Sequence, residues 1–374
     1  MVDRLTPELL GLLRSSEMPL TVYIDSQGGS IYHARLLRRL LNSPSQDGKR
    51  CPVITVVTGM AASSAADLLA AGTYAIAYAH TVIHFHGVRT ARGEITHEAA
   101  SSLAEFLRES NEGFALDLAE QVLSRFILVY LQLRAGFPGF RSANANATDV
   151  ECLVHFMTEK LGGNSELLEL AKKKHQRLNR LLEYYSTNLA GFSGSFGRPA
   201  EKEAFLLKSL IDWELQENPS PEWRLGSEGT TTIMEDFALL ADYESGQHMR
   251  SLESHIREWG QFLLEPEQRK HYDTLTEEGQ SKYLLDTTRE RFRAVWHFLV
   301  SVCRALQQGE NRLSAHDAYW LGVVDEVPGS NLHCIREVLE KQNDVQKPKR
   351  ARVSTVNLDA QAVKAPRRRS TSSK

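Results

Sequence analysis

A serine, a histidine and a pair of glycines are the residues of this sequence whose types and order could support shared chemistry. Ser63 follows two alanines, His84 comes after the next apolar segment, and Gly28 and Gly29 stand upstream of both. A histidine can take the proton of a serine hydroxyl, and fixed backbone N–H groups can stabilise the charge that develops on a carbonyl oxygen. These residues suit acyl transfer, provided that the fold brings them together.

The residues around Ser63 predict a strand followed by a helix. The segment 52–58 is apolar and rich in β-branched residues, and 61–71 consists almost entirely of helix formers and ends at Gly72. Ser63 would then lie near backbone N–H groups that the start of a helix leaves unpaired. Taken alone, the stretch favours a simpler alternative, a tightly packed helix in which Ser63 is merely a small residue.

Two flanking segments favour the chemical interpretation. Residues 20–31 predict a strand that runs into the glycine pair, where backbone can approach a ligand closely. Residues 74–87 predict a further strand pattern, with His84 at the end of its apolar run. Together the three segments supply a nucleophile, a base and a site for an anion.

The same segments resemble the signature blocks of the ClpP family of serine peptidases in order, spacing and chemistry. The matching blocks are Asp25–Ser30, Gly59–Ser63 and Thr81–His84, and Asn311–Val327 resembles the closing block of the family. The resemblance implies an α/β fold of the ClpP/crotonase type, with stacked βα units. It also implies a serine endopeptidase that works through an acyl-enzyme.

The resemblance assigns a role to each matching residue. Ser63 is the nucleophile, His84 is the general base, and the amides of Gly29 and Ser64 form the oxyanion hole. In the family an aspartate stands three residues before the leucine of the closing block, and the residue at that position here is Glu310. A glutamate can orient a histidine in a triad, so Glu310 is the expected acid.

Alternatives remain open for the acid and for the base. Asp317 and Asp325 also lie in the closing block and could replace Glu310. On a strand, His84 and His86 point to the same face, so either could approach the serine, or both could bind a metal. We expect no metal site, because no third ligand occurs at a suitable spacing.

The distance from His84 to Glu310 predicts a large insertion in the catalytic domain. Residues 1–124 and 288–340 are assigned to the ClpP-like domain, 125–287 to a mostly helical insertion, and 341–374 to a basic, disordered tail. Residues 99–118 resemble the handle helix of the family, which carries contacts between two stacked rings. The insertion could be a partner-binding arm, although a lobe that covers the catalytic domain is the simpler alternative.

Composition and charge indicate the compartment and exclude several classes of partner. The chain has 374 residues and a formal net charge of −3, which implies neither a nucleic-acid nor a membrane partner. Its 4 cysteines form no C-x-x-C pair, and the sequence holds no run of about 18 apolar residues and no signal-peptide pattern. We therefore expect a cytoplasmic protein without a cofactor.

The resemblance also bears on partners. It implies a homo-oligomer that acts on peptide or protein substrates. The family begins with a further strand and a loop that docks onto a ring-shaped unfoldase ATPase, whereas about 19 residues precede the strand that begins at Leu20. An unfoldase ATPase is a possible partner, but we expect the docking region to be absent, so dependence on ATP is not inferred.

Three other classes of protein share features with this sequence. Relatives of signal peptide peptidases pair a serine with a lysine, but this chain has no lysine between Lys49 and Lys160. Acyl-CoA enzymes of the crotonase type need no serine nucleophile, so Ser63 and His84 argue against that class. A non-catalytic subunit or scaffold of a peptidase assembly remains the main alternative, because the acid position holds a glutamate.

Overall fold

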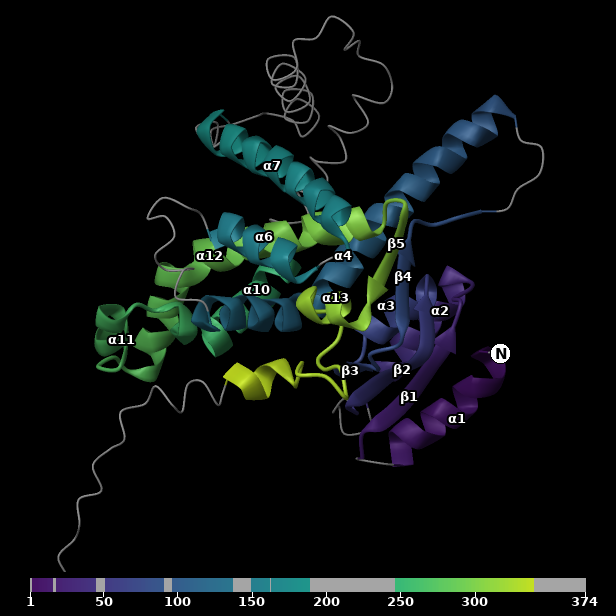
Figure 1. Ribbon diagram of the computed structural model, residues 1–374, viewed down its shortest axis with the longest axis horizontal. Helices are drawn as coiled ribbons and strands as arrows, with labels where there is room; N and C mark the ends of the chain where they lie inside the picture. The colour runs from purple at the N-terminus through teal and green to yellow at the C-terminus, as the bar shows by residue number, and fades with distance from the viewer. Residues whose placement is uncertain are drawn as a thin grey trace, which may run out of the picture.

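The computed structural model describes residues 2–15, 18–44, 51–90, 96–136, 149–161, 163–188 and 246–339 (Figure 1). In chain order the first half holds α1 (Val2–Ser15), β1 (Leu20–Ser26), α2 (Ile31–Leu41), β2 (Val53–Ala62), α3 (Ser64–Ala70), β3 (Tyr74–Ala77), β4 (Val82–His86) and α4 (His97–Gly136). The second half holds α6 (Asp149–Lys160), α7 (Ser165–Asn188), α10 (Gly246–Trp259), the 3-10 helix η2 (Gly260–Leu263), α11 (Pro266–Tyr272), α12 (Glu277–Leu306), β5 (Glu310–Ser314) and α13 (Ala315–Trp320).

A five-stranded sheet combines four strands of the N-terminal half with β5 of the C-terminal half. Its strand order is β1-β2-β4-β5, and β3 pairs with the first half of β2. The pairs of β2 with β1, β3 and β4 are parallel, whereas β4 and β5 run antiparallel. Parallel strands joined by helices define a mixed α/β protein. The predicted fold class is confirmed.

Strand and helix boundaries differ from the sequence-based expectation at two places. Strand β2 continues to Ala62 and α3 begins at Ser64, although the helix was expected to include residues from 61 onwards. Strand β4 runs to His86, so His84 is not at the strand's end. Propensity places element ends poorly, because pairing with β2 and β5 decides where β4 stops.

The C-terminal half of the described chain is mostly helical and shares its core with the sheet. Helix α12 packs against α4, α7 and α10. Phe85 of β4, Phe126 of α4 and Phe298 of α12 are all fully buried members of one hydrophobic cluster. The predicted domain boundaries at 124/125 and 287/288 fall inside α4 and α12.

Helix α4 is longer than the handle helix predicted for residues 99–118. Its 40 residues form one helix, whose N-terminal part projects away from the other helices (Figure 1). The C-terminal part is buried, as Leu118, Phe126 and Tyr130 show. A single helix thus joins an exposed arm to the protein core.

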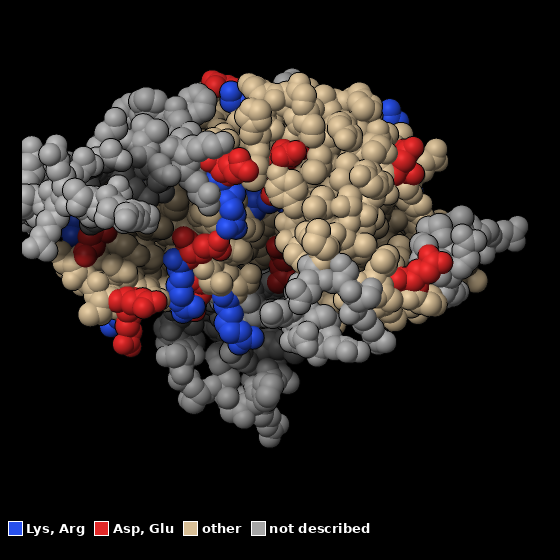
Figure 2. All heavy atoms as spheres, turned by 90° about the horizontal axis from the view of Figure 1, so that it is seen from below, with Lys and Arg blue, Asp and Glu red and all other residues tan. Residues whose placement is uncertain are grey.

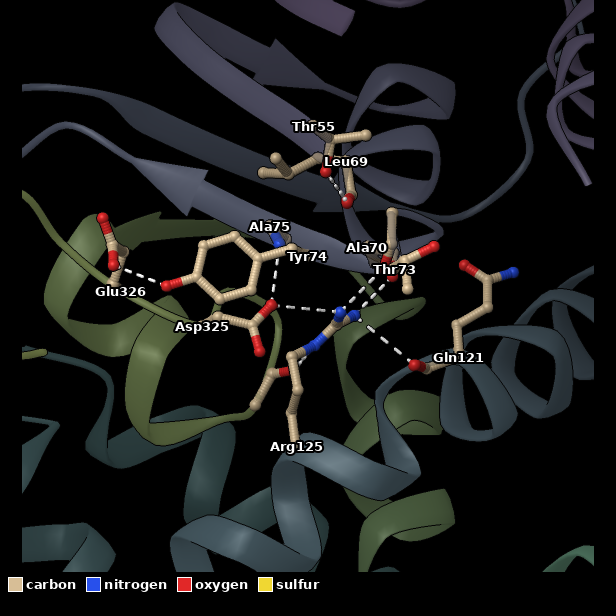
Figure 3. Close-up of polar contacts among 12 residues, drawn as sticks. Thr55, Leu69, Ala70, Thr73, Tyr74, Ala75, Gln121, Arg125, Asp325 and Glu326 are labelled. Atoms are coloured by element: carbon tan, nitrogen blue, oxygen red, sulfur yellow. Dashed lines mark hydrogen bonds and ion pairs between the residues drawn. The ribbon is translucent and has the colours of Figure 1, made fainter. Parts of the chain in front are cut away.

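A buried arginine fastens α4 to two distant parts of the chain (Figure 3). Arg125 donates from Nε to the Gly322 carbonyl at 2.8 Å and from Nη1 to the Gly72 carbonyl at 3.0 Å, and its Nη2 contacts the Ala70 carbonyl. Its Nη1 also lies 3.5 Å from Asp325 Oδ2. The guanidinium therefore satisfies carbonyl groups that the end of α3 leaves without helical partners.

The face of the molecule that Figure 2 shows carries charged side chains of both signs. Acidic and basic side chains lie interspersed on this face, without a large patch of one sign. No helix in the described ranges is both long and apolar enough to cross a membrane. The predicted basic tail, 341–374, lies outside the described residues, as does much of the predicted insertion between 189 and 245.

Candidate active site

Ser63 occupies the turn between β2 and α3. Its backbone angles are φ 55° and ψ −130°, and it is the single non-glycine residue with a positive φ in the part of the chain that the structure describes. Its N–H donates to the His84 carbonyl at 2.7 Å, and its own carbonyl accepts from Ala66 N–H at 2.8 Å. A sharp, strained strand-to-helix turn is the backbone arrangement that presents a nucleophilic serine in other hydrolases.

The glycine pair packs directly against Ser63. Gly28 has φ 91°, and a Cβ added there would lie 2.4 Å from the Ala62 carbonyl oxygen and 2.7 Å from Ser63 Cβ. The next residue, Gly29, accepts a long hydrogen bond of 3.5 Å from Ser64 Oγ. Only a glycine allows the turn to approach the serine this closely.

A pocket of about 110 Å³ opens beside Ser63. It brings together three residues that the sequence predicted for the site, Gly29, Ser63 and Ser64. The pocket is further lined by Ile31, Asp67, Phe85, His86, Gly87, Val88, Arg89, Phe114 and Gln307. Of the two histidines on β4, His86 lines this pocket and His84 does not.

The histidines lie on the same face of β4, with ring centroids 5.5 Å apart. Nδ1 of His86 lies 2.7 Å from the Gly87 carbonyl oxygen, to which it donates a hydrogen bond. That bond leaves Nε2 of the neutral ring free to accept a proton. Burial, together with the neighbouring His86, lowers the pKa of His84 from its ordinary value.

Glu310, the predicted acid, stands opposite His86 in the antiparallel pair of β4 and β5. Its Oε2 lies 3.0 Å from His84 Nε2, an approach that lacks the alignment of a hydrogen bond. Its Oε1 contacts the guanidinium of Arg89. The carboxylate of Glu310 therefore lies beside the histidines, but it also forms an ion pair with Arg89.

The two alternative acids are engaged elsewhere. Asp317 accepts hydrogen bonds from the Ser314 backbone and hydroxyl groups, at 3.0 and 2.8 Å, and from the Asn164 amide at 2.8 Å. Asp325 contacts the buried Arg125, and burial raises the pKa of Asp325 in spite of that positive charge. Both carboxylates hold the fold together around α13 and the end of α3.

Asp67 is a residue of this site that the sequence analysis missed. It lies on α3, one turn after Ser63, and its Oδ1 is buried without a hydrogen-bond partner among the described residues. Burial raises the pKa of Asp67 to about 7, although the positive charge of Arg38 opposes the shift. The signal in the sequence is an acid four residues after the serine, in a helix otherwise composed of alanine, leucine and serine.

No group of three or more histidine, cysteine, aspartate or glutamate side chains that could hold a metal ion occurs in the ranges that the structure describes. The pair His84 and His86 therefore has no third protein ligand there.

Fold and site together define an α/β protein with a serine at a strained strand-to-helix turn, beside a glycine pair and two histidines. Residues 1–109 match the family model described as Clp protease. This segment contains Ser63, the glycine pair and both histidines, and over these residues the match confirms the ClpP-family resemblance predicted from the sequence. No curated protein matches the chain. The family is one of peptidases, and the match ends well before Glu310.

Proposed function

We propose that this protein is a serine-type endopeptidase with Ser63 as its nucleophile. The observation that carries the proposal is the strained turn that places Ser63 in one pocket with His86 and Gly29. In this mechanism the Ser63 hydroxyl attacks a peptide carbonyl while a histidine takes its proton. The C–N bond then breaks as the histidine returns that proton to the leaving amine, and water hydrolyses the acyl-enzyme by the same steps.

The general base is one of the two histidines of β4. The sequence favours His84, which follows the Thr-Val-Ile run of the family motif. The pocket favours His86, which faces the same cavity as Ser63 and whose hydrogen bond to Gly87 leaves Nε2 unprotonated. We assign the base to His86, and His84 is the alternative that mutation must test.

Glu310 is the proposed acid, and the amides of Gly29 and Ser64 are the proposed oxyanion hole. Glu310 stands opposite His86 in the antiparallel pair, within side-chain reach, and its Oε2 lies 3.0 Å from Nε2 of the neighbouring His84. In this role Glu310 would stabilise the histidine cation that forms during the reaction. The place of Gly29 and Ser64 on the pocket wall supports the oxyanion hole.

The family also supports a proposal for the assembly and location of this protein. Clp proteases are typically oligomeric and act on proteins, so we propose a homo-oligomer with protein or peptide substrates. The projecting part of α4, with Phe106 exposed on it, is the proposed contact between subunits of opposite rings. All 4 cysteines are free thiols, which agrees with a cytoplasmic location.

A non-catalytic subunit of a peptidase assembly is the second candidate. Its support is the contact between Glu310 and Arg89, which engages the proposed acid in an ion pair outside the triad. In that case the fold and the helix α4 would serve assembly alone.

Labelling with a fluorophosphonate probe separates the two candidates, because the probe reacts with an activated serine whatever the substrate. We expect the assembled wild-type protein to be labelled and Ser63→Ala to remain unlabelled. Ser102→Ala, which removes an exposed hydroxyl from α4, serves as the control and should label like the wild type. A folded wild-type assembly that takes up no probe would favour the non-catalytic subunit.

A further inference from the structure

The pocket beside Ser63 carries an acidic group that the proposed mechanism does not use. Asp67 lies in the first turn of α3, four residues after Ser63, and both residues line the cavity. Apolar side chains, Ile31, Phe85 and Phe114, form other parts of the wall. A carboxylate thus lies in a pocket whose lining is partly polar and partly apolar and that begins at the nucleophile.

The cations nearest to Asp67 are committed to other groups. Arg38 donates to Asp117 at 2.9 Å, and the guanidinium of Arg35 lies 4.3 Å from the centre of the Phe114 ring. Oδ1 of Asp67 remains buried without a hydrogen-bond partner in the described chain. Leaving a buried carboxylate oxygen unpaired costs free energy, and a ligand that brings an N–H donor would recover it.

We propose that this pocket binds the substrate side chain next to the scissile bond and selects lysine or arginine through an ion pair with Asp67. The inference rests on the proposed function, because Ser63 must be the nucleophile for the pocket to face the scissile carbonyl. The long apolar stem of a lysine or arginine would pack against Phe85 and Phe114, while its charged end reaches the carboxylate. The substrates would then be proteins cleaved after basic residues.

The charge of Asp67 makes this selectivity depend on pH. The groups around it are Arg35 and Arg38 from α2, Asp117 from α4, Cys303 from α12 and His86 from β4, together with Arg89, which also lines the pocket and pairs with Glu310. With a pKa of about 7, Asp67 is neutral in mild acid and ionised above neutrality. The preference for a basic over an apolar side chain should therefore rise as the pH passes through about 7. The titration of the catalytic histidine affects both substrates equally, so it cancels in the ratio of their kcat/KM values.

The test compares fluorogenic peptides that differ only in the residue before the cleaved bond, with lysine, arginine, leucine, glutamine or glutamate at that position. For the assembled wild-type protein we expect kcat/KM for lysine and arginine to exceed that for leucine by about 10-fold or more. Asp67→Asn should lower the ratio of lysine to leucine by about 10- to 100-fold. Glu98→Gln, which removes an exposed carboxylate from α4, is the matched control and should keep the wild-type ratio.

The outcomes distinguish this inference from the proposed function. If Ser63 takes up the fluorophosphonate probe but leucine is cleaved as well as lysine, or Asp67→Asn keeps the wild-type ratio, the selectivity is refuted and the peptidase stands. If the probe does not label Ser63, both proposals fall. Circular dichroism of Asp67→Asn and its labelling by the same probe show whether the variant is folded. If it is not folded, Asp67→Glu, which keeps the charge, should retain the preference for lysine, and its loss would contradict the ion pair.

Discussion

Arg125 Nη1 lies 3.5 Å from Asp325 Oδ2, and both residues are buried. Figure 3 shows that the guanidinium also points toward the end of α3, while the carboxylate points toward the backbone of Ala75. Asp325 Oδ2 accepts a hydrogen bond of 2.7 Å from Ala75 N–H. This one ion pair therefore joins α4, the start of β3 and the segment after α13.

Removal of either partner of this ion pair should destabilise the protein strongly. Arg125→Met leaves Asp325 as an unpaired buried charge, so we expect the free energy of unfolding to fall by about 3 to 5 kcal/mol. The double variant with Asp325→Asn should lose less than the sum of the single changes, because neither charge then remains alone. Urea unfolding measures all three. Lys270→Ala, at an exposed ion pair with Glu267, is the control and should cost less than about 1 kcal/mol.

The second prediction concerns the close contact of Gly28 with Ser63. Gly28→Ala would push a methyl group into the Ala62 carbonyl and Ser63 Cβ, so the turn or the serine must move. We expect a loss of about 1 to 3 kcal/mol of stability and a marked fall in probe labelling of Ser63.

Gly309 supplies a matched comparison for that variant. Its φ is 73°, but a Cβ there would have open space around it. Gly309→Ala should therefore show only the cost of a left-handed backbone, about 1 kcal/mol, and keep normal labelling. Equal labelling in both variants would mean that the glycine turn does not position Ser63.

The third prediction separates the two histidines. His86→Ala should reduce kcat/KM by about 10³-fold or more, because it removes the proposed base, whereas His84→Ala should reduce it by less than about 10-fold. Steady-state kinetics on one peptide, together with probe labelling, measure both effects. The reverse order of effects would restore His84, the base that the sequence motif indicates.

The fourth prediction links two buried histidines to stability at low pH. Burial lowers the pKa of His175 to about 4 and that of His297 to about 3. In the unfolded chain both would titrate near 6.5, so acid favours the unfolded state once the pH falls below about 6.5. The loss of stability should be complete near the lower values, at about pH 3 to 4.

Replacing one of these histidines tests the predicted loss of stability at low pH. His297→Gln should lose about 1 to 2 kcal/mol less stability than the wild type when the pH is lowered from 7 to 5. His155→Gln, at an exposed position on α6, should follow the wild-type curve. Thermal unfolding at a series of pH values measures the difference, and parallel curves for all three proteins would refute the assignment.

The sequence predicted the elements of the N-terminal half better than the details of the candidate site. Ser63 at a strand-to-helix junction and the glycine pair beside it follow from local patterns, and the structure places them together. The identity of the base does not follow from such patterns, because His84 and His86 share one face of β4 and only the pairing with β2 and β5 sets which of them reaches the cavity. Whether either is catalytic stays a prediction.

Two charged residues show why other contacts of the core and of the site could not be predicted from the sequence. In the sequence, Arg125 looks like a polar position of a surface helix, yet the fold buries it against carbonyl groups 53 to 197 positions away. Asp67 looks like an ordinary polar residue of a short helix, yet it lies on a pocket wall. Both roles depend on contacts distant in sequence, which local periodicity does not encode.

The length of α4 has a mechanical consequence. Its 40 residues span about 60 Å as one helix. The C-terminal part is held in the protein core, and the N-terminal part projects from it. A force on the projecting end would be transmitted along the helix to Arg125, which hydrogen-bonds the carbonyl of Ala70, the last residue of α3, and that of Gly72 just beyond it. Since α3 begins beside Ser63, a single short helix connects the inner part of α4 to this serine.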